Sequence, residues 1–287
     1  MNTPDGLPLE IADFVFCGNR FPGFAKGTES QRTLRQRFGG KIIHSSRWDY
    51  EYTGGSQENP DMTKLKEKRM GVVGTGATAV QVIPELAKWA KKVVVFQRTP
   101  VSVWPRDNDV IPPESEFEKL GWQRKRMENF NALITNERPL PKENLVYDAW
   151  TKMQSHSVLK GGPSNLEEGY LEKMIEFDLL QQDAIRKRGL EVVHDKTTAE
   201  SLTPWYYGWC KRPCFSNVFL QTFNEPHVTL VDTQGQGISD ITEKGVMAND
   251  CEYEVDVIVF CTGYTLGTAI DQKKIRVKGL MDETLQE

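Results

Sequence analysis

The stretch RMGVVGTGATA, residues 69–79, decides the expected fold of this chain. Its first part, Arg69–Val73, predicts a short buried strand, because small and β-branched residues follow one another without polar alternation. A glycine-rich turn, Gly74–Ala79, comes next, and apolar residues then recur at helical spacing, with a kink predicted at Pro84. Val93–Phe96 predicts a second buried strand. The order strand, turn, helix, strand defines a βαβ unit and an α/β fold.

The turn fits the pattern GxGxxA, in which each small residue has its own physical task. Gly74 permits the tight turn, Gly76 lets the backbone approach a pyrophosphate, and Ala79 allows close packing of helix on strand. The phosphates would lie at the helix N-terminus, where free N–H groups and the helix dipole favour an anion. We therefore predict a dinucleotide site, with a tight turn that binds no ligand as the alternative. The candidate residues in and after the turn are Gly74, Thr75, Gly76, Ala77, Thr78, Ala79 and Gln81.

The end of the second strand indicates which nucleotide this site takes. An acidic residue there would bind a ribose 2′-hydroxyl, whereas an arginine suits a 2′-phosphate. The chain has Gln97, Arg98 and Thr99 at this point and no acid. Arg98 can make a bidentate contact with a phosphate, so NADPH is predicted over NADH, with Thr99 as a further candidate. The alternative for Arg98 is a solvated surface side chain.

Composition and charge exclude several other classes of protein. The 287 residues hold 36 Lys and Arg against 40 Asp and Glu, a net charge of −4, which is not the charge of a nucleic-acid-binding protein. The first residues lack a secretory signal, and the longest apolar runs are too short to cross a membrane. Five scattered cysteines favour a reducing compartment, so the expected location is the cytoplasm. Cys210 and Cys214 lack a second pair at zinc spacing, and no metal is predicted.

The rest of the chain alternates between helical and strand-like segments. Residues 101–189 are rich in charge and in prolines and predict helical excursions and loops. Strand signals return at Glu191–His194, His227–Val231 and Tyr253–Phe260, separated by turn residues. Near the start of the chain, Ile11–Gly18 predicts a strand that runs into a glycine turn.

A second motif lies about 26 residues ahead of the glycine-rich turn, in the stretch FGGKIIHSSRWD, residues 38–49. It fits F-x-G-x-x-x-H-x-x-x-W, with Phe38, Gly40, His44 and Trp48 in the fixed positions. A lone histidine beside a tryptophan is usually an ordinary core or surface residue. The combination of fixed positions ahead of a GxGxxA turn is much harder to obtain by chance.

With these two motifs the chain resembles the Baeyer–Villiger branch of the flavin-containing monooxygenases. The resemblance extends to FQRTP at Phe96–Pro100, to Lys211–Pro213, to Phe223–Asn224 and to DVIVFCTG at Asp256–Gly263. The extension WDYEYTGG at Trp48–Gly55 resembles relatives in fungal secondary metabolism. The resemblance implies an oxidoreductase in which NADPH reduces FAD and one oxygen atom of dioxygen is inserted next to a ketone. The implied substrate is a small hydrophobic ketone of a natural-product pathway.

The resemblance also assigns residues beyond the glycine-rich turn. Arg212 is similar to the active-site arginine beside flavin and nicotinamide, where a guanidinium would stabilise negative charge that develops on oxygen. Lys211 and Arg98 resemble the residues that hold the 2′-phosphate, although a solvated pair would explain Lys211 and Arg212 equally well. Thr262 and Gly263 would contribute an edge contact to FAD.

The resemblance implies a Rossmann-like NADP(H) domain with an incomplete second, FAD-type, dinucleotide-binding domain. Residues 1–64 would be a remnant of the FAD-type domain plus the linker motif, in which His44 acts structurally rather than as an acid or base. Residues 65–200 would form the NADP(H)-binding domain with a helical insertion, and residues 201–287 would return to the FAD-type remnant.

The chain departs from the family pattern at both ends. No GxGxxG turn precedes Gly74, and the sequence stops soon after Gly263, before the family's further C-terminal segment. We therefore expect the 287-residue chain to hold FAD weakly or not at all. It would then work with a partner chain or as a homo-oligomer, or be a non-catalytic NADP(H)-binding remnant. A cofactor-independent cyclase or isomerase is the remaining alternative, because such chemistry needs only a shaped pocket.

Overall fold

The structure is a computed structural model that describes residues 37–107, 119–134, 139, 141–152 and 170–263. The chain separates into two compact units. The first comprises Met1–Thr99 with His227–Glu287, and the second comprises Pro100–Pro226. The predicted strand at Ile11–Gly18 lies outside the described residues.

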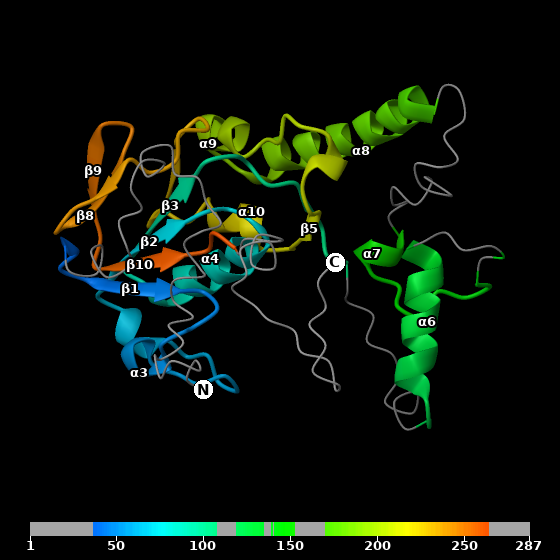
Figure 1. Ribbon diagram of the computed structural model, residues 1–287, viewed down its shortest axis with the longest axis horizontal. Helices are drawn as coiled ribbons and strands as arrows, with labels where there is room; N and C mark the ends of the chain where they lie inside the picture. The colour runs from blue at the N-terminus through cyan, green and yellow to red at the C-terminus, as the bar shows by residue number, and fades with distance from the viewer. Residues whose placement is uncertain (1–36, 108–118, 135–138, 140, 153–169, 264–287) are drawn as a thin grey trace, which may run out of the picture. The chain divides into compact units, whose positions relative to one another are not determined.

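The first unit is built on a parallel five-stranded sheet in the order β1-β10-β2-β3-β6 (Figure 1). Its strands are β1 (Lys41–His44), β2 (Arg69–Val73), β3 (Lys92–Gln97), β6 (Val228–Asp232) and β10 (Val257–Phe260). The predicted strands at Arg69–Val73, Val93–Phe96 and His227–Val231 are thereby confirmed within a residue at each end. Read from β6 through β2 to β1, the order is that of a doubly wound Rossmann-like sheet.

Helix α4 (Ala77–Trp89) follows β2 and packs against this sheet. One continuous helix runs across Pro84, whose side chain is buried together with the apolar stripe Ala79, Val80, Ile83 and Leu86. The helical spacing in the sequence therefore predicted the correct element. Short elements precede it, namely α3 (Tyr50–Thr53) and the 3₁₀ helix η1 (Thr63–Leu65).

A small antiparallel sheet lies between β6 and β10 in the chain. It consists of β7 (Asp240–Ile241), β8 (Gly245–Ala248) and β9 (Cys251–Glu254). The turn between β8 and β9 places Asn249 and Asp250 at φ values of 51° and 59°, the left-handed conformation that tight hairpins favour. Tyr253 of β9 packs edge-to-face on Phe96, with ring centroids 5.4 Å apart, and so joins this sheet to the core.

The predicted single strand at Tyr253–Phe260 is wrong, because the chain changes sheets in the middle of that segment. Glu254 pairs antiparallel with Gly245, whereas Val257 pairs in parallel with Lys41 and Met70. All four residues of β10 are buried on both faces, which explains the uninterrupted apolar run in the sequence.

The division into units also differs from the expected boundaries at residues 64 and 200. The expectation placed Lys41–His44 and Val257–Phe260 in remnants of a second domain. In the structure β10 lies between β1 and β2 and pairs with both, so these segments complete the sheet that carries the glycine-rich turn. Pairing between strands far apart in the sequence therefore sets the boundary of the first unit.

The second unit is mainly helical. Its helices are α6 (Trp122–Ile134), α7 (Ala149–Lys152), α8 (Tyr170–Val192), α9 (Lys196–Ser201), the 3₁₀ helix η4 (Gly208–Cys210) and α10 (Phe219–Thr222). Strands β4 (Val103–Trp104) and β5 (Cys214–Phe215) form a short parallel pair. The predicted strand at Glu191–His194 is wrong. Helix α8 continues through Val192, and the Val193 N–H donates to the carbonyl oxygen of Gly189 at 3.1 Å.

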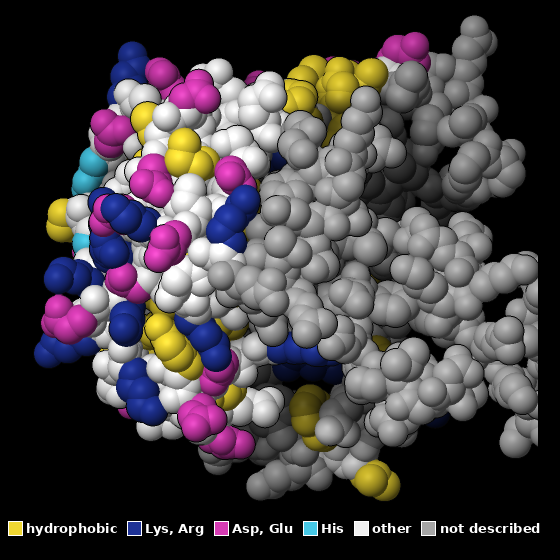
Figure 2. All heavy atoms as spheres, turned by 60° about the vertical axis from the view of Figure 1, so that its left-hand side comes forward, with side chains coloured by type: hydrophobic (Ala, Val, Ile, Leu, Met, Phe, Trp, Pro, Cys, Tyr) yellow, Lys and Arg dark blue, Asp and Glu magenta, His cyan; other side chains and the backbone are white. Residues whose placement is uncertain are grey.

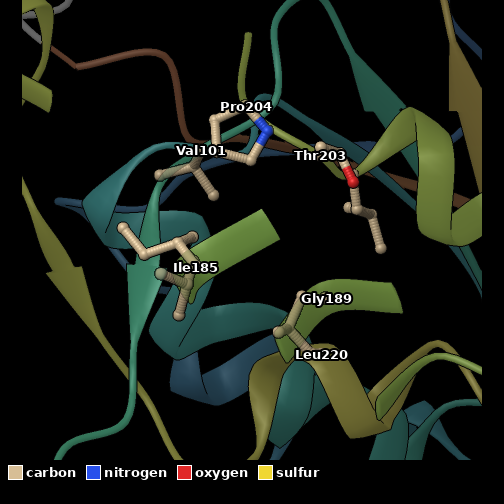
Figure 3. Close-up of a pocket in the computed structure, with 8 residues that line it drawn as sticks. Val101, Ile185, Gly189, Thr203, Pro204 and Leu220 are labelled. Atoms are coloured by element: carbon tan, nitrogen blue, oxygen red, sulfur yellow. The ribbon is translucent and has the colours of Figure 1, made fainter. Parts of the chain in front are cut away.

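This unit contains a cavity of about 10 Å³ lined mainly by apolar side chains (Figure 3). Its lining residues include Val101, Leu220, and Ile185 and Gly189 of α8. A cavity of that size has room for about one water molecule. It is therefore a gap in packing and not a substrate site.

Charges of both signs are mixed on the described part of the face that Figure 2 shows. In Figure 2, Lys and Arg side chains alternate with Asp and Glu over the face in view, without a large area of one sign. Within the described residues, none of the helices is long and apolar enough to cross a membrane.

Candidate cofactor site

The candidate site lies where the connections of the parallel sheet change direction. From β2 the chain proceeds to β3 and β6 on one side, and it then returns to β10 on the other side of β2. Ligands of such sheets bind outside the carboxyl ends of the strands at this switch point. The Cys261 N–H donates to the carbonyl oxygen of Val73 at 3.0 Å, so the ends of β10 and β2 are held side by side.

The two glycines of the turn are required for different reasons. Gly74 has φ +106°, and a Cβ atom there would lie 2.9 Å from the carbonyl oxygen of Cys261. Gly76 has an ordinary φ of −72°, and among the described residues, apart from Gly76 and its neighbours in the chain, no atom lies within 4 Å of the place where its Cβ would be. The protein thus needs a glycine at position 74 for its own backbone. At Gly76 it leaves an open space that a ligand can approach.

Helix α4 begins directly after this open space. Its N-cap residue is Gly76, which has no side chain to accept a hydrogen bond, and Ala77 and Thr78 of the first turn are exposed. The first N–H groups of the helix are therefore available to an anion. Ala79 is buried, as expected for close helix–strand packing, and the Gln81 side chain donates to the carbonyl oxygen of Ala77 at 3.0 Å. The turn fits the pyrophosphate of a dinucleotide.

Thr75 has a structural task within the turn. Its side chain is buried, and its hydroxyl donates to the carbonyl oxygen of Thr99 at 2.9 Å. This bond ties the turn to the residue that follows Arg98. Thr75 and Thr99 therefore shape the site through their contact with each other.

Arg98 is the first exposed residue after β3. The preceding side chain, Gln97, is fully buried, whereas Arg98 is exposed and has no acidic partner within the described part of the chain. Arg69 at the other end of the sheet provides a contrast. Hydrogen bonds from Arg69 to Asp256 and Glu254 raise the pKa of its guanidinium. Arg98 is thus available to a phosphate in a way that Arg69 is not.

An open groove of about 740 Å³ lies at the amino ends of β1, β10 and β2, away from the glycine-rich turn. Residues Lys41, Arg69 and Asp256 contribute to its lining, and the last two form an ion pair. Its position at the opposite edge of the sheet separates this groove from the candidate nucleotide site.

The segment after β10 reaches the same edge as the turn. Burial raises the pKa of the Cys261 thiol to about 12, and a hydrogen bond with Ser45 partly opposes this rise. Thr262 is half-buried, and Gly263 has φ +78°. These residues follow β10, the strand next to β2, so the segment that contains Thr262 and Gly263 starts close to Gly74. Their contact with a cofactor stays a prediction.

Two residues of the second motif fix the start of β1. The Phe38 side chain is 4% exposed and belongs to the core. A Cβ on Gly40 would collide with the Phe38 ring and with the carbonyl oxygen of Asp256, which also accepts from the Lys41 N–H. The glycine therefore lets β1 approach the start of β10.

The other two residues of this motif shape the end of β1 and the turn after it. The Nδ1 atom of His44 lies 2.8 Å from the Ser46 hydroxyl, and burial and the charge of Arg47 lower the pKa of His44. The Trp48 indole N–H donates to the hydroxyl of Thr53 at 3.1 Å. All four motif residues thus have contacts inside the first unit, as a structural role requires.

Curated fungal proteins match most of the chain. The FAD-binding monooxygenase ausC of Emericella nidulans is 50% identical over 232 residues, which cover 79% of this chain and 34% of that protein. The chermesin D/asnovolin J monooxidase nvfH of Aspergillus novofumigatus is 46% identical over 260 residues, which cover 89% of this chain and 38% of that protein. No protein-family model matches the chain.

Solved structures agree with these matches. The polycyclic ketone monooxygenase of Thermothelomyces thermophila aligns with a TM-score of 0.75 at 38% identity, over 87% of this chain and 42% of that one. The curated homologues are FAD-binding monooxygenases and the structural neighbours are Baeyer–Villiger monooxygenases, and the chain matches a part of each. OTEMO in complex with FAD and NADP aligns with a TM-score of 0.59 at 28% identity, over 87% of this chain and 47% of that one. The chain spans about a third to two-fifths of the curated monooxygenases it matches.

The resemblance assigns Lys211 to the 2′-phosphate and Arg212 to the active site, and both residues lie in the second unit. Lys211 and Arg212 follow η4 and are both exposed. The Lys211 ammonium lies over the ring of Tyr206, 4.7 Å from its centroid. The glycine-rich turn and Arg98 belong to the other unit, so the roles of Lys211 and Arg212 stay predictions.

From the sequence, Tyr206 is part of the apolar, aromatic segment Trp205–Trp209, which suits a bulky hydrophobic substrate or core packing equally well, and the buried Asp178 is not singled out. Asp178 lies within a helix of mixed polarity, and its contact with Gly208 spans 30 residues, so no local pattern reveals it.

The two cysteines nearest each other in the sequence differ in burial. Cys214 is buried, which raises the pKa of its thiol to about 11, whereas Cys210 is exposed. Within the residues that the structure describes, no three His, Cys, Asp or Glu side chains gather as metal ligands would.

Proposed function

We propose that this chain binds NADPH at the carboxyl edge of β2 and forms the NADPH-binding part of a flavin monooxygenase. The complete enzyme would insert one oxygen atom next to the carbonyl of a hydrophobic ketone in natural-product biosynthesis. The observation that carries the proposal is the open backbone at Gly76, at the N-terminus of α4 and at the switch point of the sheet. The names of the fungal relatives support the oxygenase part.

The residues of the first unit would bind the nucleotide by distinct means. The N–H groups at the start of α4 would hold the pyrophosphate, which approaches over Gly76. Arg98 would make a bidentate contact with the 2′-phosphate, because it is exposed and has no acidic partner within the described residues. Lys211 is assigned to the same phosphate by the resemblance.

FAD, when bound, supplies the oxygen chemistry of this family. The described residues offer one glycine-rich pyrophosphate cradle, and the proposal assigns it to NADPH. Arg212 would stabilise negative charge near the reacting oxygen, since a guanidinium stays charged at every pH of interest. Thr262 and Gly263 would contribute an edge contact at the end of β10.

The proposal is tested by titrating the 287-residue chain with NADP⁺ and with NAD⁺ by calorimetry. We expect tighter binding of NADP⁺, and we expect Arg98→Ala to remove most of the preference, a loss of about tenfold or more for a charged bidentate contact. Lys92→Ala is the matched control. It removes one exposed positive charge from the other end of the same strand. Equal affinity of the unmodified chain for both nucleotides would overturn the proposal.

A further inference from the structure

Two buried threonines hold the segment that carries Arg98. Thr75, in the glycine-rich turn, is 5% exposed, and its hydroxyl donates to the carbonyl oxygen of Thr99 at 2.9 Å. Thr233, directly after β6, is 1% exposed, and its hydroxyl donates to the carbonyl oxygen of Gln97 at 2.8 Å. Gln97 and Thr99 are the two neighbours of Arg98 in the chain. A threonine hydroxyl therefore holds the backbone on each side of the arginine.

Thr233 is itself fixed by further hydrogen bonds. Its hydroxyl accepts from the N–H of Gly237 at 2.8 Å, and its backbone N–H donates to the same carbonyl oxygen of Gln97 at 2.8 Å. The N–H of Gln236 donates to the carbonyl oxygen of Thr233 at 2.9 Å and closes the turn after β6. Thr233 therefore joins the end of β3 to a turn that has hydrogen bonds of its own.

The glycine-rich turn holds the same segment from the other side of β3. The Gly74 N–H donates to the carbonyl oxygen of Phe96 at 3.0 Å, and Thr75 adds its bond to Thr99. Because β3 lies between β2 and β6 in the sheet, the two threonines approach the segment from opposite sides. The Arg98 side chain is exposed. Its backbone is thus fixed while its guanidinium stays accessible.

A bidentate contact with a phosphate requires that two N–H groups of a guanidinium meet two oxygens in one geometry. Ordering a mobile group on binding weakens the affinity, and holding the group beforehand removes that cost. We propose that Thr75 and Thr233 are positioning residues for Arg98 and contribute through it to the preference for NADP(H) over NAD(H). The inference rests on the proposed function, in which Arg98 contacts the 2′-phosphate.

The test compares Thr75→Val and Thr233→Val with the wild type in the 287-residue chain. Valine keeps the shape of the threonine side chain and removes the hydroxyl. Calorimetry gives the ratio of the Kd for NAD⁺ to the Kd for NADP⁺. Both nucleotides carry the same pyrophosphate, so an effect on the pyrophosphate cradle cancels from this ratio. We expect each variant to lower the ratio about two- to tenfold, which corresponds to ordering one more group on binding.

A double-mutant cycle with Arg98→Ala identifies the residue through which the threonines act. In the Arg98→Ala background, Thr75→Val and Thr233→Val should leave the ratio unchanged, because the threonines act only through the arginine. An equal fall of the ratio with and without Arg98 would contradict the inference.

Further variants separate the hydroxyl from the packing of these side chains. Thr75→Ser and Thr233→Ser keep a hydroxyl and should keep the ratio of the wild type. Thr229→Val is the matched control, since it makes the same change at an exposed position of β6 and should leave the ratio unchanged. If the serine variants lose as much preference as the valine variants, packing and not the hydroxyl is responsible, and the inference fails.

A second measurement needs no variant and no nucleotide. Backbone ¹⁵N relaxation of the wild type should give Arg98 and Thr99 order parameters of about 0.85, the value of a rigid backbone. Values below about 0.6 would overturn the inference, because the segment would then be mobile before binding in spite of both threonines.

The outcomes distinguish this inference from the proposed function. The proposed function fails when the wild type does not prefer NADP⁺ or when Arg98→Ala leaves its preference unchanged, and the inference then fails with it. When Arg98→Ala lowers the preference and the two valine variants do not, the inference alone fails.

Discussion

The carbonyl oxygen of Cys261 lies 2.9 Å from the position that a Cβ atom on residue 74 would occupy. The turn after β2 and the end of β10 are therefore packed backbone against backbone. Gly74 also has φ +106°, a conformation that side chains rarely permit. The first residue of the glycine-rich turn is thus required by the fold before any ligand binds.

We therefore expect Gly74→Ala to destabilise the chain as well as to weaken nucleotide binding. Backbone strain of this kind costs about 1–3 kcal/mol, and the collision with the Cys261 carbonyl adds to it. Chemical denaturation monitored by circular dichroism measures the loss of stability. An unchanged unfolding midpoint would contradict the packing of these two segments.

Gly76→Ala should separate binding from stability. Among the described residues, no atom outside Gly76 and its neighbours in the chain lies within 4 Å of its Cβ position, and its φ of −72° suits alanine. We expect the free energy of unfolding to change by less than about 0.5 kcal/mol. The affinity for NADP⁺ should fall by about tenfold or more, because the methyl group occupies the space of the pyrophosphate. Calorimetry and denaturation on the same preparation check both, and unaltered affinity would argue against the site.

Gly189→Ala should stabilise the second unit. Gly189 lies in α8 beside the small cavity, and an added Cβ would meet only the Thr203 hydroxyl at 3.9 Å. Alanine in place of a helical glycine contributes about 0.5–1 kcal/mol. Gly208→Ala is the opposite case, since its Cβ would collide with Asp178 and Gln182. Thermal unfolding should show a higher midpoint for the first variant and a lower one for the second.

The ion pair between Arg69 and Asp256 predicts a dependence of stability on pH. The hydrogen bond from Arg69 lowers the pKa of the Asp256 carboxyl, which also accepts from the Arg69 backbone N–H at 2.7 Å. Because the folded state favours the ionised form, the stabilisation is complete above the unfolded pKa of about 3.9 and is lost as pH falls through the lower folded value.

Asp256→Asn should therefore reduce stability at neutral pH, and the difference from wild type should narrow below about pH 3.9. Glu254→Gln is the matched control with a smaller expected effect, since the Glu254 side chain is 55% exposed. Urea denaturation across the acidic range measures both. A difference that is independent of pH would show that Asp256 acts through packing alone.

The βαβ unit could be predicted because its evidence is local. Between Arg69 and Gln97, strand, turn, helix and strand follow one another, and each carries its own pattern of apolar and small residues. At Val192 and Val193 local evidence led to a wrong prediction. Their β-branched side chains favour a strand, but the final turns of α8 include Val192 and bond to Val193.

The remaining features depend on contacts between distant parts of the chain. The placement of β10 between β1 and β2 joins residues about 200 positions apart, and no periodicity encodes such a pairing. The same holds for the site. The glycine pattern predicts where a pyrophosphate can lie, but the support of the Arg98 segment by Thr75 and Thr233 requires knowledge of which segments lie side by side.

The central place of β10 has a consequence for how the molecule is made. During synthesis the ribosome releases β1, β2 and β3 long before Val257–Phe260, which must then enter between two strands already present. Until that happens, β1 lacks the partner that it has among the described strands, and one edge of β2 is open to pairing with other chains. Nascent chains stalled before residue 257 should therefore engage chaperones. Chains stalled after residue 260 has left the ribosome should no longer need them.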